Sequence, residues 1–326
     1  MVDAPLPPAM LKGASLRDHI AIMRLDHATK HVFILPGIVL AALLRGSAVH
    51  PRFWPFVAGG LAAVLIASAN YVINEWLDRD SDAHHPTKST RTAVRLRMRA
   101  GAVWGQWALL AGLGLIAGAS GGPVMGLVAA AFAAQGLVYN VPPLRSKDHA
   151  YLDVLSESVN NPLRLMLGWA MVDPVTLPPA SLLLGAWFGG AFLMGAKRLS
   201  EYREIVASHG RDLLARYRAS FARYNEISLT ASCFVHALLS AMALAIFFIK
   251  YRVEYILLLP AVAVLFGKYL AMSMHPASAA QKPETLFAER GLMAIVAVTG
   301  MLFAFCTLLD IPALAPLTAQ TFIALQ

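Results

Sequence analysis

Residues 56–82 read FVAGGLAAVLIASANYVINEWLDRDSD, an apolar run that closes on a cluster of acids. The run is long enough for a helix that crosses a bilayer, which needs about 20 residues. At its end Asn74, Asp78 and Asp82 are spaced four residues apart, so a helix places all three on one face. The stretch predicts a membrane-spanning helix with an acidic stripe, made of these three residues, at one end.

The rest of the chain repeats the apolar pattern. Of its 326 residues, 58% are hydrophobic and 14% are charged, and long apolar runs recur almost throughout. A water-soluble protein of this composition would expose too much apolar surface, and the runs lack the alternation of barrel strands. The sequence predicts one all-α domain over residues 1–326, a polytopic membrane protein with nine spans at 31–48, 53–77, 102–120, 123–140, 151–172, 179–196, 227–249, 254–272 and 291–309.

Lys and Arg are distributed unevenly between the two sides of these spans. The N-terminal tail and the connections 78–101, 141–150, 197–226 and 273–290 hold 21 of the 27 basic residues. This excess predicts a cytoplasmic N-terminus, with the C-terminus on the opposite side of a plasma or inner membrane. The net charge of +8 is therefore first a topology signal, and it suits contacts with anionic membrane lipids. Nothing in the sequence indicates a nucleic-acid partner.

The connection 78–101 begins with acids and continues with bases. The acidic stripe repels itself unless a cation binds, and Mg²⁺ takes one or two carboxylates while sharing its other positions with water and substrate phosphates. Donors for phosphate oxygens follow at His84, His85, Lys88 and Arg91. The pattern predicts a magnesium–diphosphate site with Asn74, Asp78 and Asp82 as metal ligands. The alternative is a solvated, charged loop at the membrane surface.

The span 151–172 carries polar side chains inside an apolar run. One helical face collects Asp153, Glu157, Asn160 or Asn161, and Arg164. Charged groups at this depth are costly and face a cavity or a partner, and Pro162 would bend the helix there. The face predicts a polar cavity, and the alternative is a Glu157–Arg164 salt bridge without a ligand.

Further candidate side chains lie at the cytoplasmic ends of other spans. At the cytoplasmic end of the fourth span lie Tyr139, Arg145 and Lys147. A positive-inside role explains the two cations about as well as phosphate binding does. Lys197 and Arg198 precede Glu201 after the sixth span, where a surface ion pair is the alternative. Lys30 precedes the first span and either anchors that span or reaches a site.

Together, these motifs resemble those of the UbiA superfamily of intramembrane transferases, and the likeness covers most of the chain. Glu75 stands where the family's first motif usually has Asp. The resemblance implies a helical fold around a central cavity open to the cytoplasmic side, with Mg²⁺ as cofactor. It also implies a polyprenyl lipid substrate and a diphosphate donor that loses pyrophosphate.

The decaprenyl-phosphate phosphoribosyltransferases are the branch that the sequence resembles most. Their first motif continues into His-Pro-Thr-Lys-x-x-Arg, matched by residues 85–91, and their second motif reads Lys-Arg-x-x-Glu, matched by residues 197–201. They also carry a Lys near the first span, matched by Lys30. Thr92 replaces the Pro that usually follows, and a tryptophan near the first-span Lys is missing.

This branch transfers a 5-phosphoribosyl group from phosphoribosyl diphosphate to a polyprenyl phosphate. The resemblance then assigns substrate binding to Lys30, Lys88, Arg91, Tyr139, Arg145, Lys147, Asp153, Glu157, Asn160, Arg164, Lys197, Arg198 and Glu201, with the connections 78–101 and 197–226 carrying the site. One alternative is polyprenyl transfer from a polyprenyl diphosphate to an aromatic or other small acceptor. A more remote alternative is a transporter, because intramembrane acids and arginines also mark ion pathways.

Overall fold

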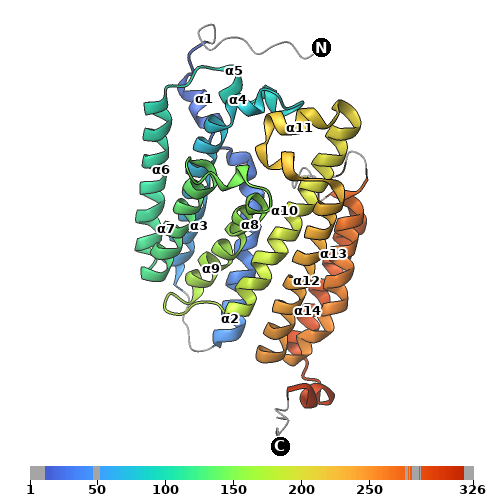
Figure 1. The fold of residues 1–326 in the computed structure, drawn as a ribbon. Helices are drawn as coiled ribbons and strands as arrows, with labels where there is room; N and C mark the ends of the chain where they lie inside the picture. Colours follow the sequence, from blue (N-terminus) through green and yellow to red (C-terminus); the bar gives the residue numbers. More distant parts are fainter. Residues whose placement is uncertain are drawn as a thin grey trace, which may run out of the picture. The chain divides into compact units, whose positions relative to one another are not determined.

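The computed structural model describes residues 12–46, 52–275, 278, 280, 286 and 288–318, and for residues 27–30 the backbone only. Throughout these ranges the regular elements are helices, and one isolated β-bridge joins Gly13 to Arg97 (Figure 1). The predicted all-α class is therefore confirmed. The chain divides into two compact units, Met1–Pro178 with Glu204–Asn225 and Pro179–Arg203 with Glu226–Gln326. The single domain expected over residues 1–326 stays a prediction.

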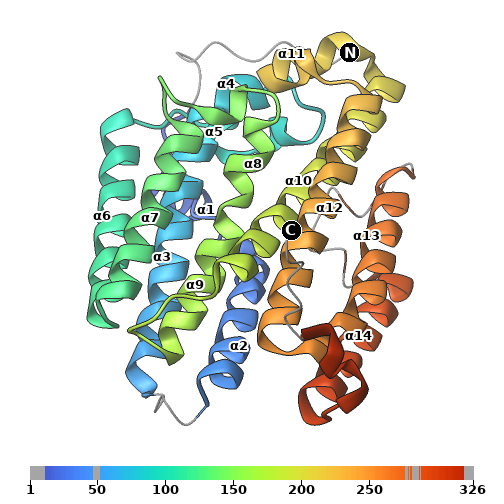
Figure 2. The same ribbon diagram turned by 60° about the horizontal axis from the view of Figure 1, so that its bottom comes forward.

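In the first unit five helices lie side by side, as Figures 1 and 2 both show. They are α2 (Leu35–Arg45), α3 (Phe53–Leu77), α6 (Ala100–Ser120), α7 (Pro123–Asn140) and α9 (Asn160–Val172). Their shared core includes the buried side chains of Ile66, Met125, Phe132 and Leu167. This bundle fixes α3 and α7 against each other, and both helices end where the acidic stripe begins.

Close approach of α2 to α9 depends on glycine. A Cβ atom at Gly37 would overlap the carbonyl oxygen of Leu165, and one at Gly168 would overlap that of Ile34. Helices in lipid gain van der Waals contact when small residues let their backbones approach. The two glycines therefore set the packing of α9, which carries Asn160 and Arg164.

Among the described residues, seven helices are long and apolar enough to cross a membrane. They match seven of the nine expected spans, at Phe53–Leu77, Ala100–Ser120, Pro123–Asn140, Ala180–His209, Glu226–Tyr251, Val253–Ser273 and Arg290–Leu308. The count of nine is not confirmed. The span expected at 151–172 is divided into shorter helices, and so is the described part of the span expected at 31–48, whose residues 47–48 lie outside the described residues.

Around the first expected span, a 3₁₀ helix (Leu25–Ile34) precedes α2, whose first turn contains Pro36 and whose C-cap is Gly46 with φ of 47°. A proline accounts for the break in the fifth expected span. The fifth expected span is divided at Val159 into α8 (Leu152–Ser158) and α9. Pro162 lacks the N–H that would bond to the Ser158 carbonyl group, so the helix is interrupted there.

Short helices cover the end of the bundle at which α3 stops. The connection 78–101 contains α4 (Arg79–Asp82), a 3₁₀ turn (Lys88–Thr90) and α5 (Thr92–Arg95), so it is mostly folded. Nearby, α1 (Leu16–Ala21) begins with a capping box between Ser15 and Asp18. Its His19 exchanges hydrogen bonds with Gln106 of α6. These contacts fix α1 against α6.

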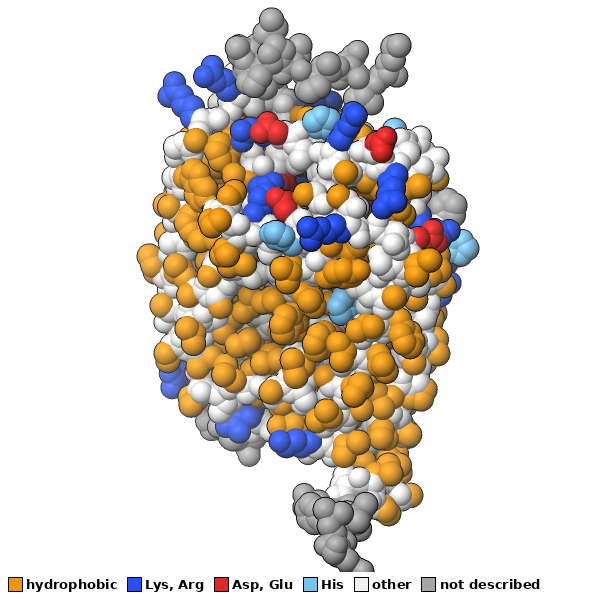
Figure 3. All heavy atoms as spheres, in the orientation of Figure 1, with side chains coloured by type: hydrophobic (Ala, Val, Ile, Leu, Met, Phe, Trp, Pro, Cys, Tyr) orange, Lys and Arg blue, Asp and Glu red, His pale blue; other side chains and the backbone are white. Residues whose placement is uncertain are grey.

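The second unit contains α10 (Ala180–His209) as far as Arg203, together with α12 (Glu226–Tyr251), α13 (Leu259–Ser273) and α14 (Arg290–Leu308). Its core includes Phe192, Cys233, Tyr269 and Leu292. Large apolar side chains are exposed in both units, among them Ile116, Leu127, Phe234 and Met301. On the face drawn in Figure 3, hydrophobic side chains (orange) cover much of the surface. Exposed apolar surface on this scale is what a bilayer covers.

Candidate functional site

The acidic stripe lies where α3 passes into α4. Asp78 caps α3, and its carbonyl oxygen accepts a 2.7 Å hydrogen bond from the backbone N–H of Asp82, so helical spacing continues across the junction. The Asn74 amide donates to the Asp78 carboxylate at 3.4 Å. The structure therefore brings the three residues together as their spacing predicted.

Two cations from the connection after α7 hold Asp78. Lys147 Nζ lies 2.6 Å and Arg145 Nη2 2.9 Å from the same oxygen, Asp78 Oδ1. Burial favours the neutral carboxyl group, but Lys147, Arg145 and Arg218 together hold the pKa of Asp78 below its usual value. Burial also lowers the pKa of Lys147 to about 8, although Asp78 opposes this. The pair is thus a buried, charged contact between two expected site residues.

Asn140, the last residue of α7, was missed by the sequence analysis. Its side-chain oxygen accepts hydrogen bonds from Asn74 at 2.6 Å and from Lys147 at 2.8 Å, and its carbonyl oxygen accepts one from Arg145 at 3.1 Å. It therefore joins the stripe to both cations. A signal existed, since Asn140 is an amide at the end of an apolar run, as Asn74 is.

Arg91 holds the other carboxylate of the stripe. Its Nη1 lies 2.5 Å from Asp82 Oδ2, and the Asp82 side chain is buried. His85 and Lys88 face the ring of Tyr217, with a 4.6 Å distance between the His85 and Tyr217 ring centroids and 5.3 Å from Lys88 Nζ to the ring. Tyr217 belongs to α11 (Arg211–Tyr217). In the sequence, only its position in a basic connection pointed to a place near the site.

Glu75 faces away from the stripe. One of its carboxylate oxygens accepts a hydrogen bond from the backbone N–H of Ala93 at 3.4 Å, and the other lies 3.7 Å from Arg24 Nη1. The acid that departs from the family's usual Asp therefore ties α3 to α5. The carboxylates of the stripe are Asp78 and Asp82 alone.

Asp153 lies in a buried network with a segment distant in sequence. Its carboxylate accepts hydrogen bonds from the hydroxyl groups of Tyr224 at 2.6 Å and Ser220 at 3.1 Å, and Arg218 Nε lies 3.5 Å away. Arg218 also donates to the Tyr139 hydroxyl group at 2.8 Å. The Tyr139 ring in turn lies 5.8 Å from Lys147 Nζ. Asp153 thus connects the 218–224 segment to the cations around Asp78.

The interruption at Val159 separates Asp153 from the rest of the expected polar face. Arg164 Nη1 donates to the carbonyl oxygen of Asn160 at 3.5 Å, and its guanidinium carbon lies 5.2 Å from the Phe132 ring. The Asn160 amide donates to the carbonyl oxygen of Glu157 at 2.9 Å. Across the described residues, no carboxylate lies within 4.0 Å of Arg164, so the Glu157–Arg164 salt bridge is not formed.

The second motif belongs to the other unit and forms a buried pair. Arg198 Nη1 lies 3.1 Å from Glu201 Oε2, and both side chains are less than one tenth exposed. The surface ion pair considered as an alternative is thus a buried contact at a spacing of three residues. Lys197 lies on the same helix, α10, and the side chain of Lys30 falls outside the described residues.

The donor set of the stripe fits a magnesium ion. Lys147 and Arg145 occupy one oxygen of Asp78, and Arg91 occupies one oxygen of Asp82, which leaves one oxygen of each carboxylate without a cation among the described residues. No group of three or more His, Cys, Asp or Glu side chains in that part of the chain forms a metal cluster. Two carboxylates, completed by water and substrate phosphates, suit Mg²⁺.

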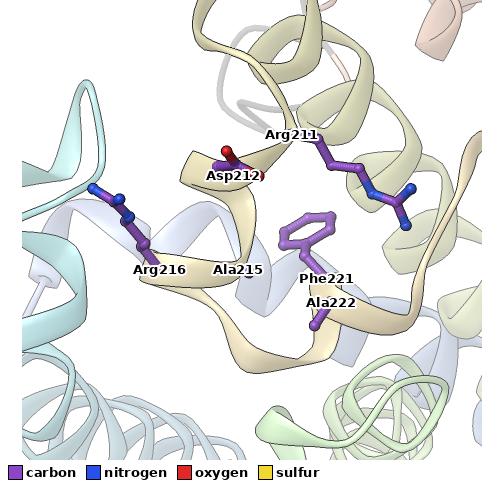
Figure 4. A pocket seen from close by; sticks show the side chains of 6 residues that line it. All are labelled: Arg211, Asp212, Ala215, Arg216, Phe221 and Ala222. Atoms are coloured by element: carbon purple, nitrogen blue, oxygen red, sulfur yellow. The ribbon is translucent and has the colours of Figure 1, made fainter.

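A depression of about 460 Å³ lies on the 204–225 segment, which also carries Tyr217 and Tyr224. It is lined by Arg211, Asp212, Ala215, Arg216, Phe221 and Ala222. In Figure 4 the Phe221 ring lies at its centre, and the side chains of Arg211 and Arg216 point in opposite directions. Because the two guanidinium groups diverge, they do not form a common anion site.

The fold is shared with several solved structures. A UbiA homologue from Archaeoglobus fulgidus bound to GPP and Mg²⁺ superposes with a TM-score of 0.66 and 17% identity, over 89% of this chain and 98% of that one. Its complex with DMAPP and Mg²⁺ superposes with a TM-score of 0.66 and 16% identity, over 88% of this chain and 97% of that one. A digeranylgeranylglyceryl phosphate synthase superposes with a TM-score of 0.58 and 11% identity, over 89% of this chain and 93% of that one. At sequence identities this low, these superpositions establish a shared fold only.

Sequence comparison identifies the family. A lycopene elongase/hydratase from Haloarcula japonica is 28% identical over 201 residues, which are 51% of this chain and 63% of that protein. The chain thus spans less than two thirds of that relative's length. Residues 33–295 match the model of the UbiA prenyltransferase family, which is most of the chain. The protein belongs to the UbiA prenyltransferase family.

Proposed function

We propose that this protein is a magnesium-dependent membrane transferase that displaces pyrophosphate from a diphosphate donor and uses a polyprenyl lipid as substrate. One observation carries the proposal: Asp78 and Asp82 share a helical face, and each is paired through one oxygen with cations. Carboxylates and cations in one buried cluster match a ligand that contains both a divalent metal and phosphate groups.

Asp78 and Asp82 would hold the metal, with Asn74 and Asn140 orienting Asp78 and its cations. When bound, Mg²⁺ supplies positive charge to the departing pyrophosphate. Lys147, Arg145 and Arg91 then exchange their carboxylate contacts for contacts with phosphate oxygens, and Lys88 adds another donor. Cations held in a buried site stabilise the charge that grows on a leaving group more strongly than they would in water.

For the donor, we propose phosphoribosyl diphosphate, with a polyprenyl phosphate as the acceptor. Residues 85–91 and 197–201 support this choice through the resemblance described above. The second motif supports it too, because it places Arg198 and Glu201, a buried ion pair, where prenyltransferases usually have a second Asp pair. Lys197, Arg198 and Lys30 remain predicted substrate-binding residues on the same resemblance.

The second candidate is polyprenyl transfer from a polyprenyl diphosphate to an aromatic or other small acceptor. The solved relatives with GPP or DMAPP and Mg²⁺, and the lycopene elongase/hydratase, favour it. In either reaction the lipid chain lies among the helices, and we propose that the N-terminus and the stripe face the cytoplasm, where the basic connections lie.

Incubation of the purified, detergent-solubilised protein with Mg²⁺ and each labelled donor tests the proposal. We expect pyrophosphate release from phosphoribosyl diphosphate only when a polyprenyl phosphate is present. Turnover of a polyprenyl diphosphate with an aromatic acid, and none of phosphoribosyl diphosphate, would select the second candidate. Release from neither donor under conditions that keep the protein folded contradicts both.

A further inference from the structure

We propose that the start of α6 carries a binding site for an anionic phospholipid of the membrane, apart from the substrate site. Five exposed cations gather there and form a basic surface, made of Lys12, Arg17, Arg95, Arg97 and Arg99. None of the five is among the residues assigned to the metal or to a substrate. The inference therefore does not depend on the proposed transfer reaction.

Backbone hydrogen bonds join the two parts of the chain that supply these cations. The N–H of Arg97 donates to the carbonyl oxygen of Lys12 at 2.9 Å, and the carbonyl oxygen of Arg97 accepts from the N–H of Ala14 at 3.1 Å. Arg97 and Arg99 are exposed, whereas Met98 between them is buried, as expected for an extended segment whose side chains alternate. Lys12 is thus held beside the two arginines.

An apolar cluster beneath the basic surface fixes its position. It contains Ile22, which follows α1, Ala93 of α5, Met98, and Val103 of α6. Figure 1 shows α1 and α5 beside this end of α6. The cations therefore stand on a packed part of the first unit.

Acids of the protein do not balance the charge of the basic surface. Apart from Arg17, whose neighbour is Asp18, none of its residues has an ionic partner in the described part of the chain. Asp18 itself accepts hydrogen bonds from Ser15 at 2.8 and 2.6 Å. By contrast, Arg91 and Lys147 each contact a carboxylate of the stripe. The topology rule accounts for cations on this side of the membrane, and an external anion accounts for their meeting without counter-ions.

The helix that follows the basic surface enters the lipid. Trp104 and Trp107 lie in the first two turns of α6, with 5.9 Å between their ring centroids, and tryptophan at the end of a span marks the membrane–water interface. Farther along α6, the exposed side chains of Leu109, Leu113 and Ile116 share one face. The basic surface thus lies at the depth of the lipid headgroups, next to a face that acyl chains cover.

Two glycines keep the first part of this face free of side chains. Gly101 and Gly105 precede Leu109 at steps of four residues, both are exposed, and a Cβ at either position would meet open space. An acyl chain can therefore lie directly against the helix backbone below the headgroup. On α1, Leu16 and Ile20 are exposed one turn apart, and they suit contact with the same lipid layer.

The ligand class is a phospholipid with a net negative headgroup, such as phosphatidylglycerol. Arginine side chains pair with phosphate oxygens through two parallel hydrogen bonds, and basic residues at a membrane surface attract anionic lipids. Phosphatidylcholine has the same phosphate but adds a quaternary ammonium group, which the basic surface repels. The surface therefore predicts a preference for the anionic lipid at equal chain length.

Lipid binding to the delipidated, full-length protein in detergent tests the proposal, without Mg²⁺ or donor. The probes are phosphatidylglycerol and phosphatidylcholine with the same acyl chains, and native mass spectrometry and the Tm report binding. We expect phosphatidylglycerol to bind the wild type more tightly and to raise its Tm more. The double variant Arg97→Gln/Arg99→Gln should bind it at least about tenfold more weakly, and Arg97→Lys/Arg99→Lys, which keeps the charge, within about threefold of the wild type.

The matched control is Arg216→Gln/Arg223→Gln, which removes the same charge from two exposed residues of the 204–225 segment in the same unit. It should keep phosphatidylglycerol binding, and all variants should have the wild-type Tm without lipid, because the replaced side chains are exposed. The inference is overturned if both lipids bind the wild type equally, if Arg97→Gln/Arg99→Gln keeps its binding, or if the control loses as much.

A C15 prenyl monophosphate serves as a competitor, because the substrate lipid also carries phosphate. Displacement of phosphatidylglycerol by this probe at equal concentration would assign the basic surface to the substrate and would also overturn the inference. All of these readouts are taken without turnover. The failure of the proposed reaction would leave them unchanged, so the two proposals fail separately.

Discussion

The carboxylate of Asp153 accepts a 2.6 Å hydrogen bond from the hydroxyl group of Tyr224, across 71 residues of sequence. Tyr224 and its neighbours Ser220 and Arg218 come from the connection that follows α10, and all three contact the same buried acid. Arg218 continues to Tyr139, beside Lys147. A carboxylate that sequence reasoning assigned to a cavity wall thus holds a distant segment against the Asp78 cluster.

Replacing this acid should loosen the 218–224 segment. Asp153→Asn removes the buried carboxylate that Arg218 Nε contacts at 3.5 Å, and breaking such a buried pair costs about 3 kcal/mol. We expect a lower Tm and faster tryptic cleavage after Arg218 and Arg223. Tyr224→Phe removes one hydroxyl group and should cost only about 1 kcal/mol. Equal protease resistance in Asp153→Asn and the wild type would show that the network does not hold the segment.

Lys147 should oppose metal binding and favour donor binding. In the described structure it neutralises Asp78 at 2.6 Å. Lys147→Met removes that charge, so we expect Mn²⁺ to bind the donor-free protein at least as tightly as it binds the wild type. The KM for the diphosphate donor should rise at least about tenfold, because a charge-assisted contact to phosphate is lost. Metal titration by electron paramagnetic resonance and steady-state kinetics measure the two effects, and weaker metal binding with an unchanged KM would contradict the assigned role.

The Tyr217 ring should contribute to donor affinity through Lys88 and His85. The contact of Lys88 Nζ with the ring, at 5.3 Å, is worth about 1 kcal/mol in a partly buried setting. Tyr217→Leu should therefore raise the KM for the donor about fivefold, with little change in kcat. Tyr217→Phe keeps the aromatic face and serves as the control. An equal rise in both variants would assign the effect to the hydroxyl group instead.

The α2–α9 packing should depend on the absence of a side chain at Gly168. A Cβ there would overlap the carbonyl oxygen of Ile34, so Gly168→Ala should destabilise the protein by about 2 kcal/mol. Gly60 of α3 has open space around its Cβ position, and Gly60→Ala should leave the Tm unchanged or raise it slightly. Thermal unfolding in detergent compares the two, and an unchanged Tm in Gly168→Ala would contradict the close approach.

The helical class and most spans could be predicted from the sequence, because lipid restricts the backbone to a few structures. The acidic stripe could be predicted because helical spacing determines which residues share a face. The lengths of the first and fifth spans could not be predicted in this way. At Pro162, for example, hydropathy changes little, whereas the backbone loses a hydrogen bond.

The contacts around the stripe also differ in whether the sequence could predict them. Asp78 and Asn74 are close in sequence, so their contact follows from spacing. Tyr217, Arg218 and Tyr224 reach the site only through the tertiary fold; Arg218, for example, lies 79 residues from Tyr139. In the sequence their segment reads as a solvated basic connection, and no local pattern separates these residues from the other arginines and tyrosines around them.

The central claim, that Asp78 and Asp82 bind a metal–diphosphate complex, is tested most directly by the Mg²⁺ dependence of pyrophosphate release in Asp78→Asn and Asp82→Asn. Each variant keeps the volume of the side chain and removes its charge. The account predicts that the wild type requires Mg²⁺ and that each variant, folded as judged by its Tm, loses at least about a hundredfold in kcat/KM, since one metal ligand is worth several kcal/mol in the transition state. Wild-type release without Mg²⁺, or full activity in either variant, would contradict it.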